Sequence, residues 1–128
     1  EETCLRPVRG LSYADLRHGP IAVVDADHVA VLVTAQDGPM VAGMTELAND
    51  LRERGVGATI GIGGDEGFAA ACDVAVRGPD LPELVAPLAL AVPAQLVVEA
   101  LARRLGLDPD APRGLSKVTQ TDMGGTAT

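Results

Sequence analysis

Residues 29–34, Val-Ala-Val-Leu-Val-Thr, form a short and continuous apolar run, which predicts a strand buried on both faces, as in a parallel sheet. The turn residues Gln-Asp-Gly-Pro at 36–39 follow this run. Apolar side chains then recur at helical spacing from Val41 to Leu51, and Gly55 ends the predicted helix. A buried strand followed by a helix is typical of α/β proteins.

The same kind of pattern continues along the chain. Apolar runs at 57–62 and 73–77 predict two more strands, and the glycine-rich segment 63–67 between them is expected to be a loop. With the buried type of strand and the intervening helix, the sequence predicts an α/β fold with a parallel sheet flanked by helices.

Two segments are harder to assign. A long helix is predicted from 81 to 106, broken or kinked near Pro87 and Pro93. A fourth strand is an option near Leu5–Val8, although this segment contains Pro7 and shows neither alternation nor helical spacing.

The length and charge of the chain limit its classes of partner. Its 128 residues are enough for one domain with a hydrophobic core. The 18 acidic and 10 basic side chains give a net charge of −8, which argues against nucleic acid and anionic membranes as partners. Cys4 and Cys72 lack metal-ligand spacing and are expected to be reduced, in a cytoplasmic protein. We expect neither a membrane-spanning run of ~18–20 apolar residues nor a signal peptide.

Two side chains are candidates for chemistry. Lys117 follows two prolines and lies among small and apolar residues in the segment 108–119. A lysine in that setting loses part of its hydration, so its amine is a candidate nucleophile or cationic clamp. His18 precedes Gly19-Pro20, a sharp turn, and histidine ordinarily titrates near neutral pH, which suits proton transfer. Taken alone, a histidine beside a turn or a lysine near a chain end is more commonly structural or solvated.

Two other clusters carry weaker signals for ligands. The segment 61–64, Gly-Ile-Gly-Gly, follows a predicted strand, but acidic residues come next, so a tight turn is favoured over a phosphate loop. Asp25, Asp27 and His28 carry metal-ligating atoms, but three ligands within four residues cannot converge from the start of an extended strand. The sequence therefore predicts neither a metal nor a cofactor.

Four stretches, taken in order over residues 2–119, resemble a known family. They are similar to the C-terminal sugar isomerase (SIS) lobe of the glucosamine-6-phosphate synthase family, also called the glutamine–fructose-6-phosphate aminotransferase family. The first stretch, Glu2-Thr3-Cys4, resembles Lys-Glu-x-x, and the second, 15–20 (Asp-Leu-Arg-His-Gly-Pro), resembles Glu-(Leu/Phe)-x-His-Gly-Pro. The third, 92–96 (Val-Pro-Ala-Gln-Leu), resembles Val-Pro-Leu-Gln-Leu. The fourth, 106–119, resembles Gly-x-Asp-x-Asp-x-Pro-Arg-x-Leu-x-Lys and the two residues after it.

The resemblance implies both a fold and a set of roles. It implies a three-layer, flavodoxin-like parallel sheet flanked by helices and lacking its first strand, with residues 1–122 forming a second SIS lobe truncated at its N-terminus and 123–128 a disordered tail. By the same resemblance Glu2 moves a proton between C1 and C2 of a sugar phosphate, and Lys117 forms a Schiff base with the ketose. His18 promotes ring opening from a neighbouring subunit, which implies a homodimer.

The sequence also departs from the family pattern. Asp15 stands where the family has glutamate, the family's His-Ala-Glu-Ala stretch is replaced around Arg6–Arg9, and its Ser/Thr-rich phosphate loop has no counterpart. Two functions therefore stay open. One is ketose–aldose isomerisation of a hexose phosphate or amino-hexose phosphate, coupled to amination or deamination and completed by a missing first SIS lobe. The other is a catalytically inert lobe that binds sugar phosphate or dimerises.

Overall fold

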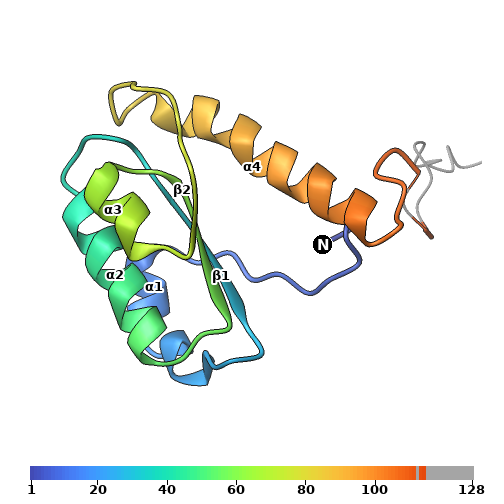
Figure 1. The fold of residues 1–128 in the computed structure, drawn as a ribbon, viewed down its shortest axis with the longest axis horizontal. Coiled ribbons are helices and arrows are strands. Elements are labelled where there is room, and N and C mark those ends of the chain that lie inside the picture. The colour runs from blue at the N-terminus through green and yellow to red at the C-terminus, as the bar shows by residue number, and fades with distance from the viewer. Residues whose placement is uncertain (112, 115–128) are drawn as a thin grey trace, which may run out of the picture. The chain divides into compact units, whose positions relative to one another are not determined.

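The computed structural model describes residues 1–111, 113 and 114 (Figure 1). They divide into a larger unit, residues 9–97, and a smaller unit made of residues 1–8 and the described residues from 98 onward. The elements in chain order are α1 (Tyr13–Arg17), the 3-10 helix η1 (Pro20–Val23), β1 (Val29–Thr34), α2 (Val41–Glu53), β2 (Ala58–Gly63), α3 (Glu66–Ala71), β3 (Val74–Val76) and α4 (Ala86–Arg104).

The larger unit is built on a parallel sheet whose described strands follow the order β1-β2-β3. β1 and β2 pair along their whole length, from Val29 opposite Ala58 to Thr34 opposite Gly63. β3 pairs with residues 60–62 of β2. α2 connects β1 to β2 and α3 connects β2 to β3, as parallel strands require crossover connections. The predicted α/β fold, a parallel sheet flanked by helices, is confirmed.

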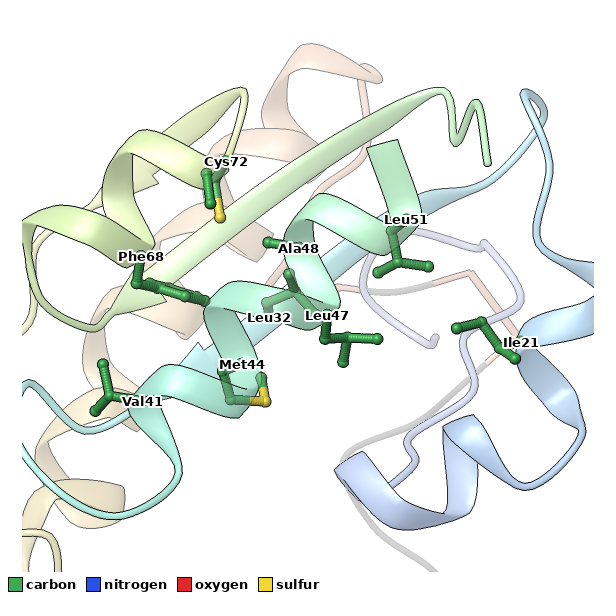
Figure 2. Close-up of a cluster of buried hydrophobic side chains, with 10 residues drawn as sticks. Ile21, Leu32, Val41, Met44, Leu47, Ala48, Leu51, Phe68 and Cys72 are labelled. Atoms are coloured by element: carbon green, nitrogen blue, oxygen red, sulfur yellow. The ribbon is translucent and has the colours of Figure 1, made fainter. Parts of the chain in front are cut away.

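One face of the sheet is covered by α2 and α3, which pack a hydrophobic core against it (Figure 2). Leu47 and Leu51 of α2 and Phe68 of α3 are at most 1% exposed. They belong to the same cluster as Leu32 of β1, because the apolar side chains of α2 recur on the side of the helix that faces the sheet. The other buried members of this cluster are Ile21, Val41, Met44, Ala48, Ala71 and Cys72.

The opposite face of the sheet is partly covered in the described part of the chain. Leu90, in the first half of α4, packs in one cluster with Ile62 of β2. Val29, Val31 and Val33 of β1 alternate toward this face and are 61%, 52% and 44% exposed. The prediction that this strand is buried on both faces is therefore wrong, because no described segment packs over the valines.

The short helix α3, Glu66–Ala71, begins inside the segment 63–67 that was expected to be a loop and continues beyond it. Asp65 caps it, and its carboxylate accepts the backbone N–H of Phe68 at 2.8 Å. Gly64 has a φ of +67°, and a Cβ atom at this position would overlap the ring of Phe68. The glycines thus let the chain turn tightly over a buried aromatic ring, which supports a tight turn and not a phosphate loop.

A hydrogen-bond cluster joins the starts of β2 and β3. Thr59 is 0% exposed, and its backbone N–H and its hydroxyl donate to Asp73 Oδ2 at 2.8 and 2.9 Å. The N–H of Asp73 donates to Thr59 Oγ1 at 2.9 Å, and Arg52 Nε lies 3.5 Å from Asp73 Oδ1. The hydrogen bonds from Thr59 hold the pKa of the Asp73 carboxyl below its usual range, with a smaller contribution from Arg52.

Two further expectations about secondary structure are corrected. Residues Leu5–Val8 form no strand; the chain turns over residues 2–5 and then has no regular structure up to α1. α4 is continuous from Ala86 to Arg104, although Pro93 lies inside it. Pro87 occupies its first turn, where the backbone N–H groups have no partner within the helix, so the N–H that proline lacks is not needed there.

α4 is also long and apolar enough to cross a membrane, judged by length and composition alone. A window within its 19 residues has a mean hydropathy of 1.3, which corrects the expectation that no run of ~18–20 residues is apolar enough to span a membrane. One such helix is weak evidence, because core helices of soluble proteins pass the same test. The absence of a membrane partner therefore stays a prediction.

Candidate functional site

The smaller unit brings the N-terminal segment beside the end of α4 (Figure 1). Gly106, with a φ of +71°, ends the helix, and the N–H of Leu107 donates back to the carbonyl of Ala102 at 2.9 Å. This glycine-dependent reversal turns the chain out of the helical direction. Cys4 is buried, and its Sγ donates to the carbonyl of Val98 in α4 at 3.4 Å. Residues from both ends of the sequence therefore share one small packing unit.

A pocket of about 140 Å³ lies between these two segments. Glu2, the predicted proton-transfer residue, lines it together with two charged residues of the other segment, Asp108 and Arg113. Its remaining lining residues are Thr3, Leu5, Gly106, Leu107 and Ala111. Pockets that enclose whole small-molecule ligands usually measure roughly 300–1,000 Å³, so this one is large enough for only part of a hexose phosphate.

Local hydrogen bonds shape both walls of the pocket. The carboxylate of Glu1 accepts the N–H of Val8 at 2.9 Å, which closes the N-terminal segment on itself. On the other wall, the carboxylate of Asp108 accepts the N–H of Asp110 at 2.9 Å, and the Asp108 carbonyl accepts the N–H of Ala111 at 3.3 Å. Asp108 thus holds a turn of the kind that aspartate favours.

His18 lies in the larger unit, at the end of α1. Its backbone N–H donates to the carbonyl of Ala14 at 3.1 Å, and its imidazole is exposed. Gly19, with a φ of +139°, directs the chain away immediately after it. Arg17 Nη2 forms a 2.6 Å ion pair with Asp50 Oδ2, which ties α1 to α2. The predicted sharp turn is confirmed, and it presents the histidine ring on an anchored helix end.

The structure does not test whether the three predicted catalytic residues meet. Glu2 belongs to the smaller unit and His18 to the larger one. Lys117 lies outside the described residues. The structure does add Thr3 and Arg113, which sequence reasoning did not single out although both lie in the two motifs that carry the family resemblance.

The cluster before β1 has a structural explanation. His28 Nδ1 lies 2.7 Å from Asp25 Oδ1, and the same carboxylate accepts the N–H of Asp27 at 3.0 Å. The hydrogen bond to His28 is the main cause that lowers the pKa of Asp25. Among residues 1–111, 113 and 114, no three His, Cys, Asp or Glu side chains are grouped so that they could hold a metal ion.

Comparison with known proteins identifies the family. No protein-family model matches the chain. The glutamine–fructose-6-phosphate aminotransferase (isomerizing) of Pyrococcus horikoshii is 36% identical over 108 residues, which cover 84% of this chain and 18% of that protein. The Escherichia coli K12 protein of the same name is 32% identical over 104 residues, 80% of this chain and 17% of its own. A Sphingobium yanoikuyae protein, also of that name, is 33% identical over 111 residues, 84% of this chain and 70% of its own length.

The chain belongs to the glutamine–fructose-6-phosphate aminotransferase family. The family resemblance of its four motifs is thereby confirmed. The chain spans about a fifth of the length of the P. horikoshii aminotransferase and about the same share of the E. coli one. The Sphingobium aminotransferase is of more similar length to this chain.

Proposed function

We propose that residues 1–122 form a second SIS lobe that takes part in ketose–aldose isomerisation of fructose 6-phosphate or glucosamine 6-phosphate type, within an aminotransferase or deaminase. The observation that carries the proposal is the pocket that Glu2 shares with the segment leading to Lys117. Lys117 follows Arg113 of that pocket by four positions in the sequence. Because an extended residue spans at most ~3.6 Å, the chain keeps the Cα of Lys117 within about 14 Å of the Cα of Arg113.

The proposed chemistry uses the three candidate residues in sequence. His18, contributed by the other subunit of a homodimer, promotes opening of the sugar ring. The amine of Lys117 adds to the C2 carbonyl and water leaves, which produces a Schiff base. An amine from the nitrogen donor, or water in the reverse direction, then displaces the lysine amine from C2, which frees Lys117. Glu2 removes the C1 proton of the released imine or ketose and returns it to C2. No metal or redox cofactor takes part in these steps.

The phosphate group is bound by another part of the assembly in this proposal. The pocket is too small for a whole hexose phosphate, and the family's Ser/Thr-rich phosphate loop has no counterpart in the sequence. A first SIS lobe supplies that loop, in the same polypeptide or in a partner. The protein is cytoplasmic and acts in amino-sugar metabolism, with a hexose phosphate or amino-hexose phosphate as ligand and neither nucleic acid nor membrane as a partner.

Borohydride trapping tests the Schiff base. The assembly purified from the native source is incubated with D-fructose 6-phosphate and sodium borohydride, and peptides are analysed by mass spectrometry. Reduction of the C=N bond leaves a stable amine, so the Lys117 peptide should gain one sugar phosphate less one oxygen atom. Lys117→Arg, which keeps the charge, should abolish the adduct. An unmodified Lys117 peptide in an assembly that turns over substrate removes the Schiff base from the mechanism.

A catalytically inert lobe that binds sugar phosphate or dimerises is the second candidate. The replaced stretch around Arg6–Arg9 favours it, because the family pattern is lost there. Proton exchange distinguishes the two functions. Glu2→Gln should abolish solvent exchange of the C1 protons of D-fructose 6-phosphate if the lobe is catalytic. Binding of the sugar phosphate without exchange in the wild type would support the inert lobe.

A further inference from the structure

The pocket beside Glu2 contains a cation for which the sequence analysis named no role, Arg113. Two charged side chains near it in the sequence already have partners. Arg103, at the end of α4, pairs with Glu99. Asp108 holds the turn before Arg113 through its bond to the N–H of Asp110. Arg113 follows this turn in the sequence and lines the same cavity as Glu2, and its guanidinium is permanently charged.

The charge balance of the pocket indicates what this guanidinium binds. Glu2 and Asp108 each carry a carboxylate, so with Arg113 the charged lining groups sum to −1. Such a lining favours a phosphate dianion less than a cluster of cationic side chains would. A neutral sugar end that develops negative charge only during the reaction is compatible with it, because the guanidinium then faces the new charge at short range. The volume of about 140 Å³ also suits the reacting end of an open-chain sugar.

Isomerisation creates this kind of transient charge. When Glu2 takes the C1 proton, the electron pair of that C–H bond forms the C1=C2 double bond, and the π electrons at C2 move onto the heteroatom bound there. Glu2 then returns its proton to C2, and the hydroxyl proton on the C1 oxygen passes to the C2 heteroatom, which gives the aldose. The N–H donors of a guanidinium beside C1 and C2 stabilise the intermediate by hydrogen bonding and neither gain nor lose a proton.

We propose that Arg113 binds the C1 oxygen and the C2 heteroatom of the open-chain sugar, and that it stabilises the enediolate-like intermediate that forms when Glu2 removes the C1 proton. The hydroxyl of Thr3, in the same pocket, is a second donor to these atoms. This role rests on the isomerisation proposed above and assigns the phosphate to a different part of the assembly.

The test compares Arg113→Ala and Arg113→Lys with Arg104→Ala, in which an arginine of the same unit outside the pocket lining is removed. Two ligands are titrated into the native assembly: D-fructose 6-phosphate, and 5-phospho-D-arabinonohydroxamate as a planar mimic of the enediolate. Arg113→Ala should lower the affinity for the mimic roughly 10- to 100-fold and the affinity for the substrate by less than about threefold. It should also lower kcat by about the same factor as the affinity for the mimic. Lysine should restore part of both losses, and Arg104→Ala should change neither.

The outcomes separate this role from the proposed function. If Arg113→Ala lowers the affinity for both ligands equally, Arg113 contacts the phosphate or another group present in the ground state, and its proposed stabilisation of the intermediate is overturned. Unchanged binding and unchanged kcat would overturn it as well. If the wild-type assembly neither binds the two ligands nor exchanges the C1 protons, the isomerase function itself fails. Circular dichroism of each variant confirms that the fold is retained.

Discussion

Replacement of Leu47 by alanine tests whether the α2 core carries the stability of the larger unit. Leu47 is 1% exposed and belongs to the cluster between α2, α3 and the sheet. The substitution removes three carbon atoms, and at about 0.8 kcal/mol for each buried methylene the lost burial costs about 2.4 kcal/mol. Incomplete collapse of the cavity raises the cost to about 3–4 kcal/mol. That is a large share of the roughly 5–15 kcal/mol that stabilises a typical domain.

Urea unfolding followed by circular dichroism measures this cost. With an m-value of about 1.5–2 kcal/mol/M, the midpoint of Leu47→Ala should fall by about 2 M. Leu88→Ala in α4 is the matched control, because the same atoms are removed from a side chain that is 82% exposed. It should change the free energy of unfolding by less than about 0.5 kcal/mol. The reasoning is refuted if the two variants lose equal stability, or if Leu47→Ala loses less than about 1 kcal/mol.

Two further predictions concern the sheet. The lowered pKa of Asp73 stabilises the fold above the ordinary aspartate value near 4, and this contribution is lost as the pH falls through the folded-state pKa. Thr59→Val removes the hydroxyl bond to this carboxylate and keeps the backbone N–H bond, which is the larger cause of the lowered pKa. The stability of this variant, measured by unfolding between about pH 2 and 7, should therefore depend less on pH than that of wild type or Thr59→Ser. Identical pH profiles would contradict this prediction. Gly63→Ala should destabilise by more than about 2 kcal/mol in thermal unfolding, because Gly63 has a φ of +82° and a Cβ would overlap the carbonyl of Thr34. Gly10→Ala, where no atom lies within 4 Å of the added Cβ, is the control, and comparable losses in the two variants would count against the strain argument.

The elements that the sequence predicted correctly have a clear local pattern, a continuous apolar run for β1 and a helical period for α2. The strand at 29–34 has the bounds of β1, and the helix expected from Val41 to Leu51 corresponds to α2, Val41–Glu53. Hydrophobic periodicity identifies such elements because the backbone geometry alone fixes which side chains share a face. It does not identify what covers each face. The exposed side of β1 shows this limit, since a continuous apolar run has the same sequence whether one face or both are covered.

α3 was missed for a different physical reason. The segment from Gly63 to Gly67 is rich in glycine, and glycine locally favours turns. Two tertiary features outweigh that tendency, the Asp65 cap and the fully buried ring of Phe68. The same glycines serve the helix, because a side chain at Gly64 would overlap the ring. A turn signal in the sequence therefore marked a tight strand-to-helix connection.

The candidate site shows why motifs alone did not give its geometry. Glu2 and Arg113 lie near opposite ends of the sequence, so no local period or spacing relates them. Bringing them together closes a long loop, and the entropy cost of that closure cannot be judged from local sequence patterns. The cost is offset by contacts in the smaller unit, where Cys4 bonds to the end of α4 and Gly106 reverses the chain. These closing residues have no chemical role in the proposed reaction. They nevertheless determine that a carboxylate from one motif and a guanidinium from another line the same pocket, which is the arrangement from which the role of Arg113 follows.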